Sequence, residues 1–98
     1  MSIQVKFEKD MAIPCLEGNF DETSSRSVEE KMMECLSKDV KNIRFDMSKV
    51  KYVSSAGIRV LIIAYKKALK TGKKISLAAM SPKVEETIRT VGILPMFV

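Results

Sequence analysis

The stretch Val50-Lys51-Tyr52-Val53-Ser54-Ser55-Ala56-Gly57-Ile58-Arg59-Val60 decides how this chain folds, because its side-chain pattern changes in the middle. The residues up to Val53 read as a buried strand, and from Ile58 onward apolar residues recur with the helical period of about 3.6. Backbone N–H groups at a helix start lack partners inside the helix and carry about half a positive charge. A serine at this junction can therefore cap the helix or carry a phosphate.

The helix that follows the junction is predicted to continue to Gly72. A glycine in the left-handed conformation commonly ends a helix, so Gly72 is its expected stop. One face is apolar and the opposite face is basic, as in a helix that packs on a core. The apolar residues are Leu61, Ile62, Tyr65, Ala68 and Leu69, and the basic ones are Lys66, Lys67 and Lys70.

Upstream of the junction, alternating apolar residues predict strands at 3–7, 11–16 and 43–47. The polar pair Lys9-Asp10 between the first two strands predicts the turn of an N-terminal hairpin. Pro14 cannot donate a backbone hydrogen bond, so we expect it at a sheet edge, a bulge or a strand end.

Two polar segments are expected to be loops, and the first helix is expected between them. The loops are Gly18-Asn19-Phe20-Asp21 and Ser48-Lys49. Ser27 with Glu30 three residues later fits a capping box, which predicts the helix start at Ser27. The buried face of this helix is predicted to be Val28, Met32, Cys35 and Leu36.

The last quarter of the chain predicts a strand at 75–79 and a third helix. That helix is expected to begin with Ser81 as the cap and Pro82 at the first helical position, and to end at Gly92. Residues 94–98 are expected to add a short last strand. Strands that alternate with helices imply right-handed parallel crossovers. The predicted fold is therefore α/β, with a mixed four- to five-stranded sheet, an N-terminal hairpin and three helices.

Length and composition limit the class of protein. The 98 residues are expected to form one domain over 1–98, and 46% apolar with 30% charged residues is typical of a globular chain. No run of about 18 apolar residues and no signal-like N-terminus occurs, so we expect a cytoplasmic protein without membrane insertion.

The net charge is +5, but no aromatics interleave the lysines, so direct nucleic-acid binding is not expected. A solvated helix face or the steering of an acidic protein partner explains the lysine group better. This group is Lys66, Lys67, Lys70, Lys73 and Lys74.

The side-chain inventory argues against an enzyme. No histidine is present, which removes the common zinc sites and catalysis by imidazole. Cys15 and Cys35 are the only cysteines, and we expect them to be reduced packing residues. A nucleotide hydrolase that uses the helix-start anion site is one further hypothesis, but no Walker lysine and no evident pair of carboxylates support it. We therefore expect no catalytic residue, no metal and no cofactor.

The junction also carries a family resemblance. Asp46-Met47-Ser48, followed by Val50 and the run from Tyr52 to Leu61, closely resembles the signature of STAS domains, specifically of bacterial anti-sigma factor antagonists. The resemblance covers nearly the whole chain. It extends to Gly18-Asn19-Phe20-Asp21, to Gly72-Lys73 and to Ser81-Pro82 with Val91-Gly92-Ile93. It implies a protein whose unmodified form binds an anti-sigma factor, usually a serine kinase, and thereby frees a sigma factor.

The resemblance also implies which residues act. The kinase is expected to phosphorylate the serine two places before the signature glycine, which is Ser55, and a serine phosphatase of the PP2C type is expected to reverse this. Ser54 stands where other antagonists carry an acidic residue, and it is the second candidate for the phosphate. Free N–H groups near Gly57 and Ile58 are expected to hold the phosphate. The implied partner surface is Asp21, Ser54, Ser55, Ala56, Gly57, Ile58 and Arg59.

Several of these residues have a structural interpretation beside the functional one. Gly57 either lets a partner approach or packs at the helix start. Asp21 is either a partner contact or a helix cap, and Arg59 is either a contact or a solvated side chain. A STAS domain that docks on a transporter ATPase or another signalling assembly, and is never phosphorylated, is the alternative function.

Overall fold

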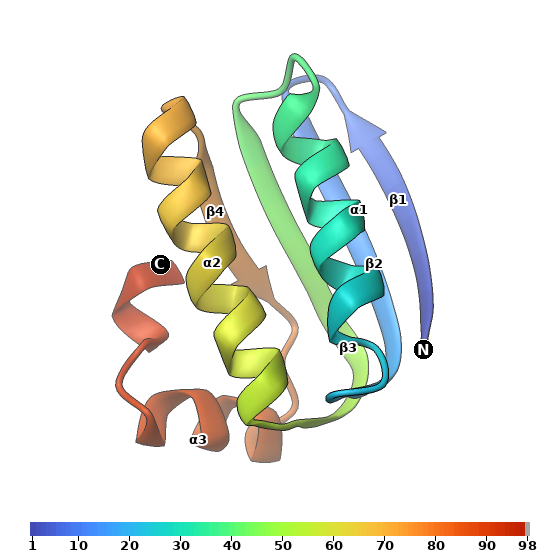
Figure 1. Ribbon diagram of the computed structural model, residues 1–98, viewed down its shortest axis with the longest axis vertical. Helices are drawn as coiled ribbons and strands as arrows, with labels where there is room; N and C mark the ends of the chain where they lie inside the picture. The colour runs from blue at the N-terminus through green and yellow to red at the C-terminus, as the bar shows by residue number, and fades with distance from the viewer. Residues whose placement is uncertain (98) are drawn as a thin grey trace.

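The computed structural model describes residues 1–97 as a four-stranded sheet with three α-helices. In chain order the elements are β1 (Ser2–Glu8), β2 (Met11–Phe20), α1 (Ser25–Ser37), β3 (Asn42–Val53), α2 (Ser55–Thr71), β4 (Lys74–Ala78), α3 (Pro82–Thr90) and the 3-10 helix η1 (Leu94–Phe97). The strand order is β1-β2-β3-β4, with β1 antiparallel to β2 and the other pairs parallel. The predicted α/β class, mixed sheet, hairpin and helix count are confirmed (Figure 1).

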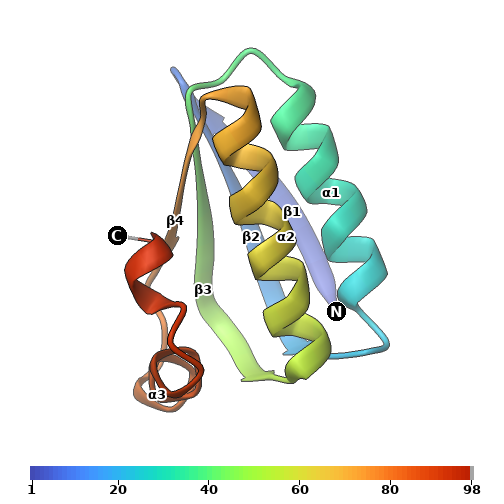
Figure 2. The same cartoon turned by 60° about the vertical axis from the view of Figure 1, so that its left-hand side comes forward.

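The core lies between the sheet and two helices. α1 and α2 run side by side over one face of the sheet, and α3 lies at the carboxyl end of β4 (Figures 1 and 2). Side chains on a strand alternate between faces, so every second strand residue points toward the helices. The fully buried strand residues Ile43, Phe45 and Met47 follow this rule and pack against Met32 of α1 and Leu61 of α2 within one core. The predicted buried face of α1 is confirmed.

β2 and β3 are longer than the sequence pattern predicts. Two predictions of loops were wrong. Gly18 to Phe20 belong to β2, and Ser48-Lys49 lie inside β3. The register of this strand pair shifts between Cys15 and Glu17 and again between Gly18 and Asn19. Such irregularities break the apolar alternation while pairing continues, so the pattern suggests a strand end where none exists.

The expectation for Pro14 was also wrong. It lies in the middle of β2, an interior strand, opposite Val5 of β1. The pairing of β2 with β3 passes from Ala12 to Cys15 without using Pro14. An interior strand therefore tolerates a residue without an N–H donor where its ladder has a gap.

α1 begins at Ser25, two residues before the predicted start at Ser27. Ser24 occupies the N-cap position, but its hydroxyl donates to the carbonyl of Asn19 over 2.7 Å and accepts from the N–H of Asp21 over 3.0 Å. The side chain thus ties the helix start back to β2 and does not cap the helix. The predicted capping box does not start this helix, because Ser27 is already inside it.

The predicted start of α3 and the predicted stop of α2 are confirmed, and of the two serines at the junction Ser54 is the cap of α2. Ser54 and Ser81 are N-caps whose hydroxyls accept from Ala56 and Val84, and Pro82 is the first residue of α3. Gly72 ends α2 in the left-handed conformation with φ of 70°. α2 itself begins at Ser55, directly after the cap.

The predicted last strand was wrong. Residues 94–97 form η1, and Val98 lies outside the described residues. The ring of Phe97 is buried and meets Tyr65 of α2 edge to face, with ring centroids 5.9 Å apart. Burial of this ring holds the segment beside Tyr65, where η1 also contacts β4 and α3 without pairing as a strand.

Both cysteines are free thiols, and Cys35 is buried on α1, where burial raises its pKa. No helix within residues 1–97 has the length and apolar character to cross a bilayer.

Candidate functional site

The carboxyl ends of β2, β3 and β4 meet at one edge of the sheet, and α1 and α2 begin there (Figure 1). The N–H of Ser54 donates to the carbonyl of Phe20 over 2.9 Å, which ties the end of β2 to the start of α2. Asp21 directly follows Phe20 and therefore lies beside the two serines. The predicted surface residues from both segments are thus brought together, at the edge where open parallel sheets bind ligands.

The two serines have different surroundings. Ser54 is buried, with 8% of its surface exposed, and its hydroxyl accepts the N–H of Ala56 over 3.1 Å. Ser55 is the first residue of α2 and is exposed. Ser54 is therefore the structural cap, and Ser55 presents its hydroxyl to solvent.

The backbone at the start of α2 is already hydrogen bonded in part. The N–H of Ile58 donates to the carbonyl of Ser54 over 2.9 Å, and the N–H of Ala56 is used by the cap. The expectation that the N–H of Ile58 is free to hold a phosphate was wrong, because the regular helical bond forms there. A negative charge on Ser55 would still meet the positive end of the helix dipole.

Gly57 is required for packing. A Cβ atom at this position would lie 2.6 Å from the carbonyl oxygen of Phe20 and 2.9 Å from Cγ1 of Val53. The glycine is buried against the chain's own strands, so the packing interpretation accounts for it. Its role is to bring α2 close to β2, which holds Ser55 and Asp21 near each other.

Asp21 shapes the turn between β2 and α1. Its carboxylate accepts the hydroxyl of Thr23 over 2.6 Å and the N–H of Thr23 over 3.0 Å. These bonds hold the pKa of Asp21 below its usual value, and the bond from the Thr23 hydroxyl has the largest effect. The carboxylate is therefore negative at neutral pH. The N-cap of α1 is Ser24, so the helix-cap interpretation of Asp21 was wrong.

The remaining residues of the predicted surface differ in exposure. Arg59 is exposed one helical turn after Ser55, and none of the ion pairs among residues 1–97 includes it. Ala56 is half-buried, and Ile58 packs against the core. Tyr52, at the end of β3, has 50% of its surface exposed and was not predicted. Its position between the buried Val50 and Val53 could have indicated an outward-facing ring.

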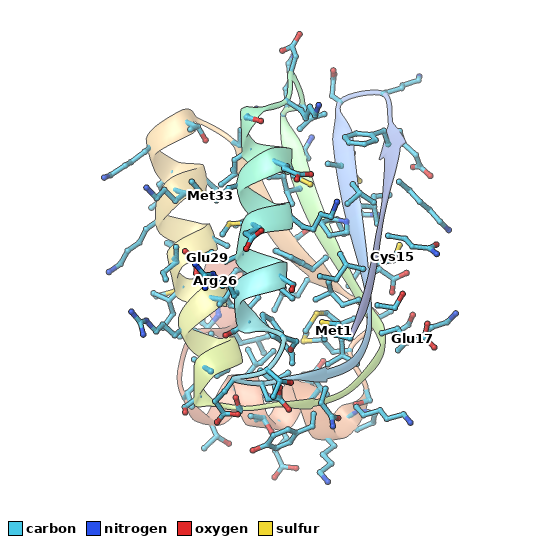
Figure 3. The ribbon with its side chains drawn as sticks, turned by 45° about the vertical axis from the view of Figure 1, so that its right-hand side comes forward. Met1, Cys15, Glu17, Arg26, Glu29 and Met33 are labelled. Atoms are coloured by element: carbon cyan, nitrogen blue, oxygen red, sulfur yellow. The ribbon has the colours of Figure 1, made fainter. Side chains whose placement is uncertain are left out.

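The open face of the sheet carries a separate hollow of about 300 Å³. Cys15, Glu17 and Asp46 are among its lining residues. Figure 3 shows Cys15 and Glu17 on the strand side of the molecule, away from Arg26 and Glu29 of α1. This hollow does not include Ser55. Within residues 1–97, no group of three or more His, Cys, Asp or Glu side chains is placed to hold a metal ion.

Comparison with known proteins identifies a matching family and curated relatives, of which BtrV is one example. A family model described as the STAS domain matches residues 2–98. BtrV of Bordetella bronchiseptica, named as a candidate anti-sigma factor antagonist, is 26% identical over 87 residues, which are 89% of this chain and 75% of BtrV.

Solved structures share the fold at low sequence identity. The anti-sigma factor antagonist SpoIIAA in its unphosphorylated form has a TM-score of 0.85 at 15% identity, covering 99% of this chain and 86% of SpoIIAA. Phosphorylated SpoIIAA from Bacillus has a TM-score of 0.77 at 14% identity, and the match covers 99% of this chain and 89% of SpoIIAA. The STAS domain of a SulP transporter from Vibrio cholerae has a TM-score of 0.73 at 18% identity, and the match covers 95% of this chain and 72% of that domain's chain. At these identities the likeness shows the fold alone, and one fold serves different functions.

Proposed function

Because this chain belongs to the STAS domain family, we propose that it is an anti-sigma factor antagonist switched by phosphorylation of Ser55. In this proposal its single STAS domain, residues 1–98, binds in the unmodified form an anti-sigma factor that is also a serine kinase, which releases a sigma factor in the cytoplasm. A serine phosphatase of the PP2C type reverses the modification. The observation that carries the proposal is the exposed Ser55 beside a buried, capping Ser54.

The environments of the two serines favour Ser55 as the phosphate acceptor. A kinase needs a hydroxyl that can reach its active site, and Ser54 is buried while its hydroxyl accepts the N–H of Ala56. Phosphate on Ser54 would remove a cap worth about 1 kcal/mol and would place a dianion against the core. Ser55 carries neither penalty.

The local electrostatics allow the domain to keep its fold after modification. A phosphoserine carries about −1.5 to −2 charges, which the positive end of α2 stabilises. Arg59 lies one turn further on the same helix face and can approach that phosphate. The likeness to SpoIIAA in both its unphosphorylated and its phosphorylated form agrees with a switch that needs no refolding.

The partner surface would respond differently. A surface that fits a neutral hydroxyl would have to bury a doubly charged group, which costs several kcal/mol. Each 1.4 kcal/mol is about tenfold in affinity, so we expect a loss of a hundredfold or more. The proposed partner surface is Asp21 and residues 54–59, with Ser55 and Arg59 as the exposed side chains and Ser54 and Gly57 as the residues that position them.

Calorimetric titration with the cognate anti-sigma factor tests this proposal. We expect Ser55→Ala to bind like the wild type and to remain bound in the presence of ATP, and Ser55→Asp to bind at least about a hundredfold more weakly. Ser27→Asp, the same change on the exposed face of α1, is the matched control and should bind normally. Equal affinity of the two Ser55 variants would contradict the switch. Fragmentation mass spectrometry of the kinase-treated protein then assigns the phosphate to Ser54 or Ser55.

The alternative is a STAS subunit that docks on a transporter ATPase or another signalling assembly and is never phosphorylated. The similarity in fold to the STAS domain of a SulP transporter is the observation that favours it. Under this alternative, protein purified from its own cells would carry no phosphate on Ser55 under any growth condition and would copurify with a transporter or ATPase subunit.

A further inference from the structure

β1 is an edge strand whose outer side is open. It pairs with β2 on one side only. Apart from β2, no element within residues 1–97 makes more than slight contact with it, and it lies at the outer margin of the sheet (Figure 1). The edge strand on the other side of the sheet, β4, is contacted by η1.

The pairing of β1 with β2 determines where the backbone groups of β1 point. In an antiparallel pair, opposite residues alternate between those that exchange N–H···O=C bonds and those whose backbone groups point away from each other. Pro14 lies opposite Val5 and has no N–H, so these two residues do not exchange such bonds. The ladder between β2 and β3 skips Pro14, as expected if the missing donor is on that side. The N–H and C=O of Val5 therefore point away from β2.

The same alternation applies along the whole of β1. Its register with β2 has no shift, so Ile3 and Phe7, two residues on either side of Val5, also direct their N–H and C=O groups outward. These groups have no partner in β2. A row of unpaired backbone groups on an edge strand is a template for pairing with another strand.

β1 lacks most of the features that prevent edge pairing. It has seven residues, contains no proline and is not interrupted by a bulge. Its only charged residues, Lys6 and Glu8, have opposite signs and lie on the open face of the sheet, because side chains alternate between faces. Phe7, on the face that the helices cover, still has 56% of its surface exposed.

The apolar side of β1 is complementary to its own copy. In an antiparallel register centred on Val5, the outward backbone groups of Val5 face those of Val5 in the second copy. Ile3 of each copy then lies opposite Phe7 of the other. All of these apolar pairs fall on the helix face, where Ile3 and Val5 already pack against the core. The register therefore covers Phe7 and satisfies the outward backbone groups together.

The polar side of β1 fits the same register. On the open face the opposite residues are Gln4 with Lys6 and Ser2 with Glu8. No like charges are directly opposite, and each Lys6 lines the hollow that also contains Glu17 and Asp46 of its own sheet. A shift by one pair in one direction would place Lys6 against Lys6. A shift in the other direction would leave Phe7 opposite Met1, which lies outside β1.

We propose that β1 pairs in this antiparallel register with β1 of a second copy of the chain, which gives a twofold dimer with one continuous sheet. The twofold axis is perpendicular to the sheet, so the helices of both copies lie on the same face. The strands of the two copies run in opposite directions, so the two Ser55 sites lie at opposite ends of the dimer. Each site stays open to its own partner, and a failure of the Ser55 switch would leave this inference unaffected.

The dimer is expected to dissociate on dilution. A single strand pair covers less surface than the roughly 1,600 Å² that a standard interface buries. Sedimentation equilibrium of the full chain from about 10 μM to about 1 mM should therefore show a mass that rises from that of the monomer toward twice that value.

Hydrogen exchange measured by NMR at the two ends of this concentration range locates the contact. The amides of Ile3, Val5 and Phe7 should exchange about tenfold more slowly or less at the high concentration, because only the dimer bonds them. The amides of Gln4 and Lys6 bond to β2 in the monomer, so their protection should depend much less on concentration.

Two pairs of variants test the strand edge. Val5→Pro removes an outward N–H that the monomer does not use, so it should fold and stay monomeric, whereas Gln4→Pro removes a donor to β2 and should destabilise the chain. Phe7→Glu should weaken association about tenfold or more. Leu69→Glu is its matched control on α2, where 61% of the leucine is exposed, and should associate like the wild type.

Several results would overturn the proposal. They are a monomer at every concentration, association that survives Val5→Pro, an equal loss in Leu69→Glu, or concentration-dependent protection at residues outside β1. If the chain is monomeric and an extended peptide selected from a phage-displayed library slows exchange at the three outward amides, β1 receives a strand from another protein and the inference is wrong. Thermal unfolding of each variant shows whether a loss of association comes from a loss of fold.

Discussion

The two ends of α2 are held in place by different means. At the first end the backbone of Ser54 bonds to Phe20, and Gly57 lets the helix touch β2 at backbone distance. At the last end Gly72 stops the helix, and the long side chain of Lys73 donates to the carbonyl oxygens of Lys38 and Val40, which follow α1. The first end thus presents one small hydroxyl on a closely packed frame. The last end is held by one long side chain and carries exposed lysines.

The largest expected effect breaks the close packing at the first end. In Gly57→Ala the new methyl group would meet a backbone oxygen, which cannot move like a side chain, so we expect a loss of about 2–3 kcal/mol in unfolding free energy. Gly72→Ala is the matched control: nothing lies within 4 Å, and only the strain at φ of 70° remains, about 1–2 kcal/mol. Urea unfolding measures both. If Gly72→Ala destabilises more, close packing does not explain Gly57.

The next effect tests the anchor at the last end. Lys73→Met keeps the length of the side chain but removes two hydrogen bonds from a charged donor, so we expect about 1.5 kcal/mol of destabilisation. Lys74→Met, the neighbouring exposed lysine, should change stability by less than about 0.5 kcal/mol. Denaturant unfolding of the pair distinguishes an anchor from a surface charge. Equal values for both variants would show that the bonds of Lys73 contribute nothing.

A smaller effect separates the two serines. Ser54→Ala removes the cap of α2 and should reduce stability by about 1 kcal/mol, whereas Ser55→Ala should stay within about 0.5 kcal/mol. Thermal unfolding followed by circular dichroism compares the two. A larger loss from Ser55→Ala would reverse the assignment of cap and exposed hydroxyl.

The smallest effect concerns pH at the turn beside the first end. The pKa of Asp21 is lower in the folded protein than its ordinary value of about 3.9, because Thr23 bonds to the charged form. The folded state therefore gains stability above pH 4 that is lost as the pH falls through the lowered pKa. Unfolding free energies measured from about pH 5 down to pH 2 should fall less steeply in Asp21→Asn than in the wild type. Parallel curves would mean that Thr23 does not affect this titration.

Local signals explain which parts of the fold were predictable. The cap Ser81, the stop at Gly72 and the turn at Lys9-Asp10 depend on residues next to one another, and all were correct. Which of Ser54 and Ser55 caps α2 was left open by the sequence, and the structure shows that it is Ser54. The apolar stripe of α1 was also correct, because it needs only the helical period. The start of α1 was not, because Ser24 bonds back to Asn19 on a strand and leaves no capping signature.

Non-local contacts explain the remaining differences. The lengths of β2 and β3 depend on a shifted register between two strands, and η1 depends on the contact between Phe97 and Tyr65. In both cases the two contacting segments are far apart in the sequence, so the residues near either one do not reveal the contact. The same holds for the exposed Tyr52, which the pattern of β3 suggested only weakly.

The amino-acid sequence by itself determined the α/β class, the cap of α3, the stop of α2 and the candidate serines at the start of α2, since these rest on periodicity and on neighbouring residues. Only the tertiary structure decided that Asp21 lies beside those serines, that Ser54 is buried while Ser55 is exposed, and that Gly57 is needed for packing. The physical reason is that burial and close approach depend on which strand packs against which helix. Those contacts form between segments far apart in the chain.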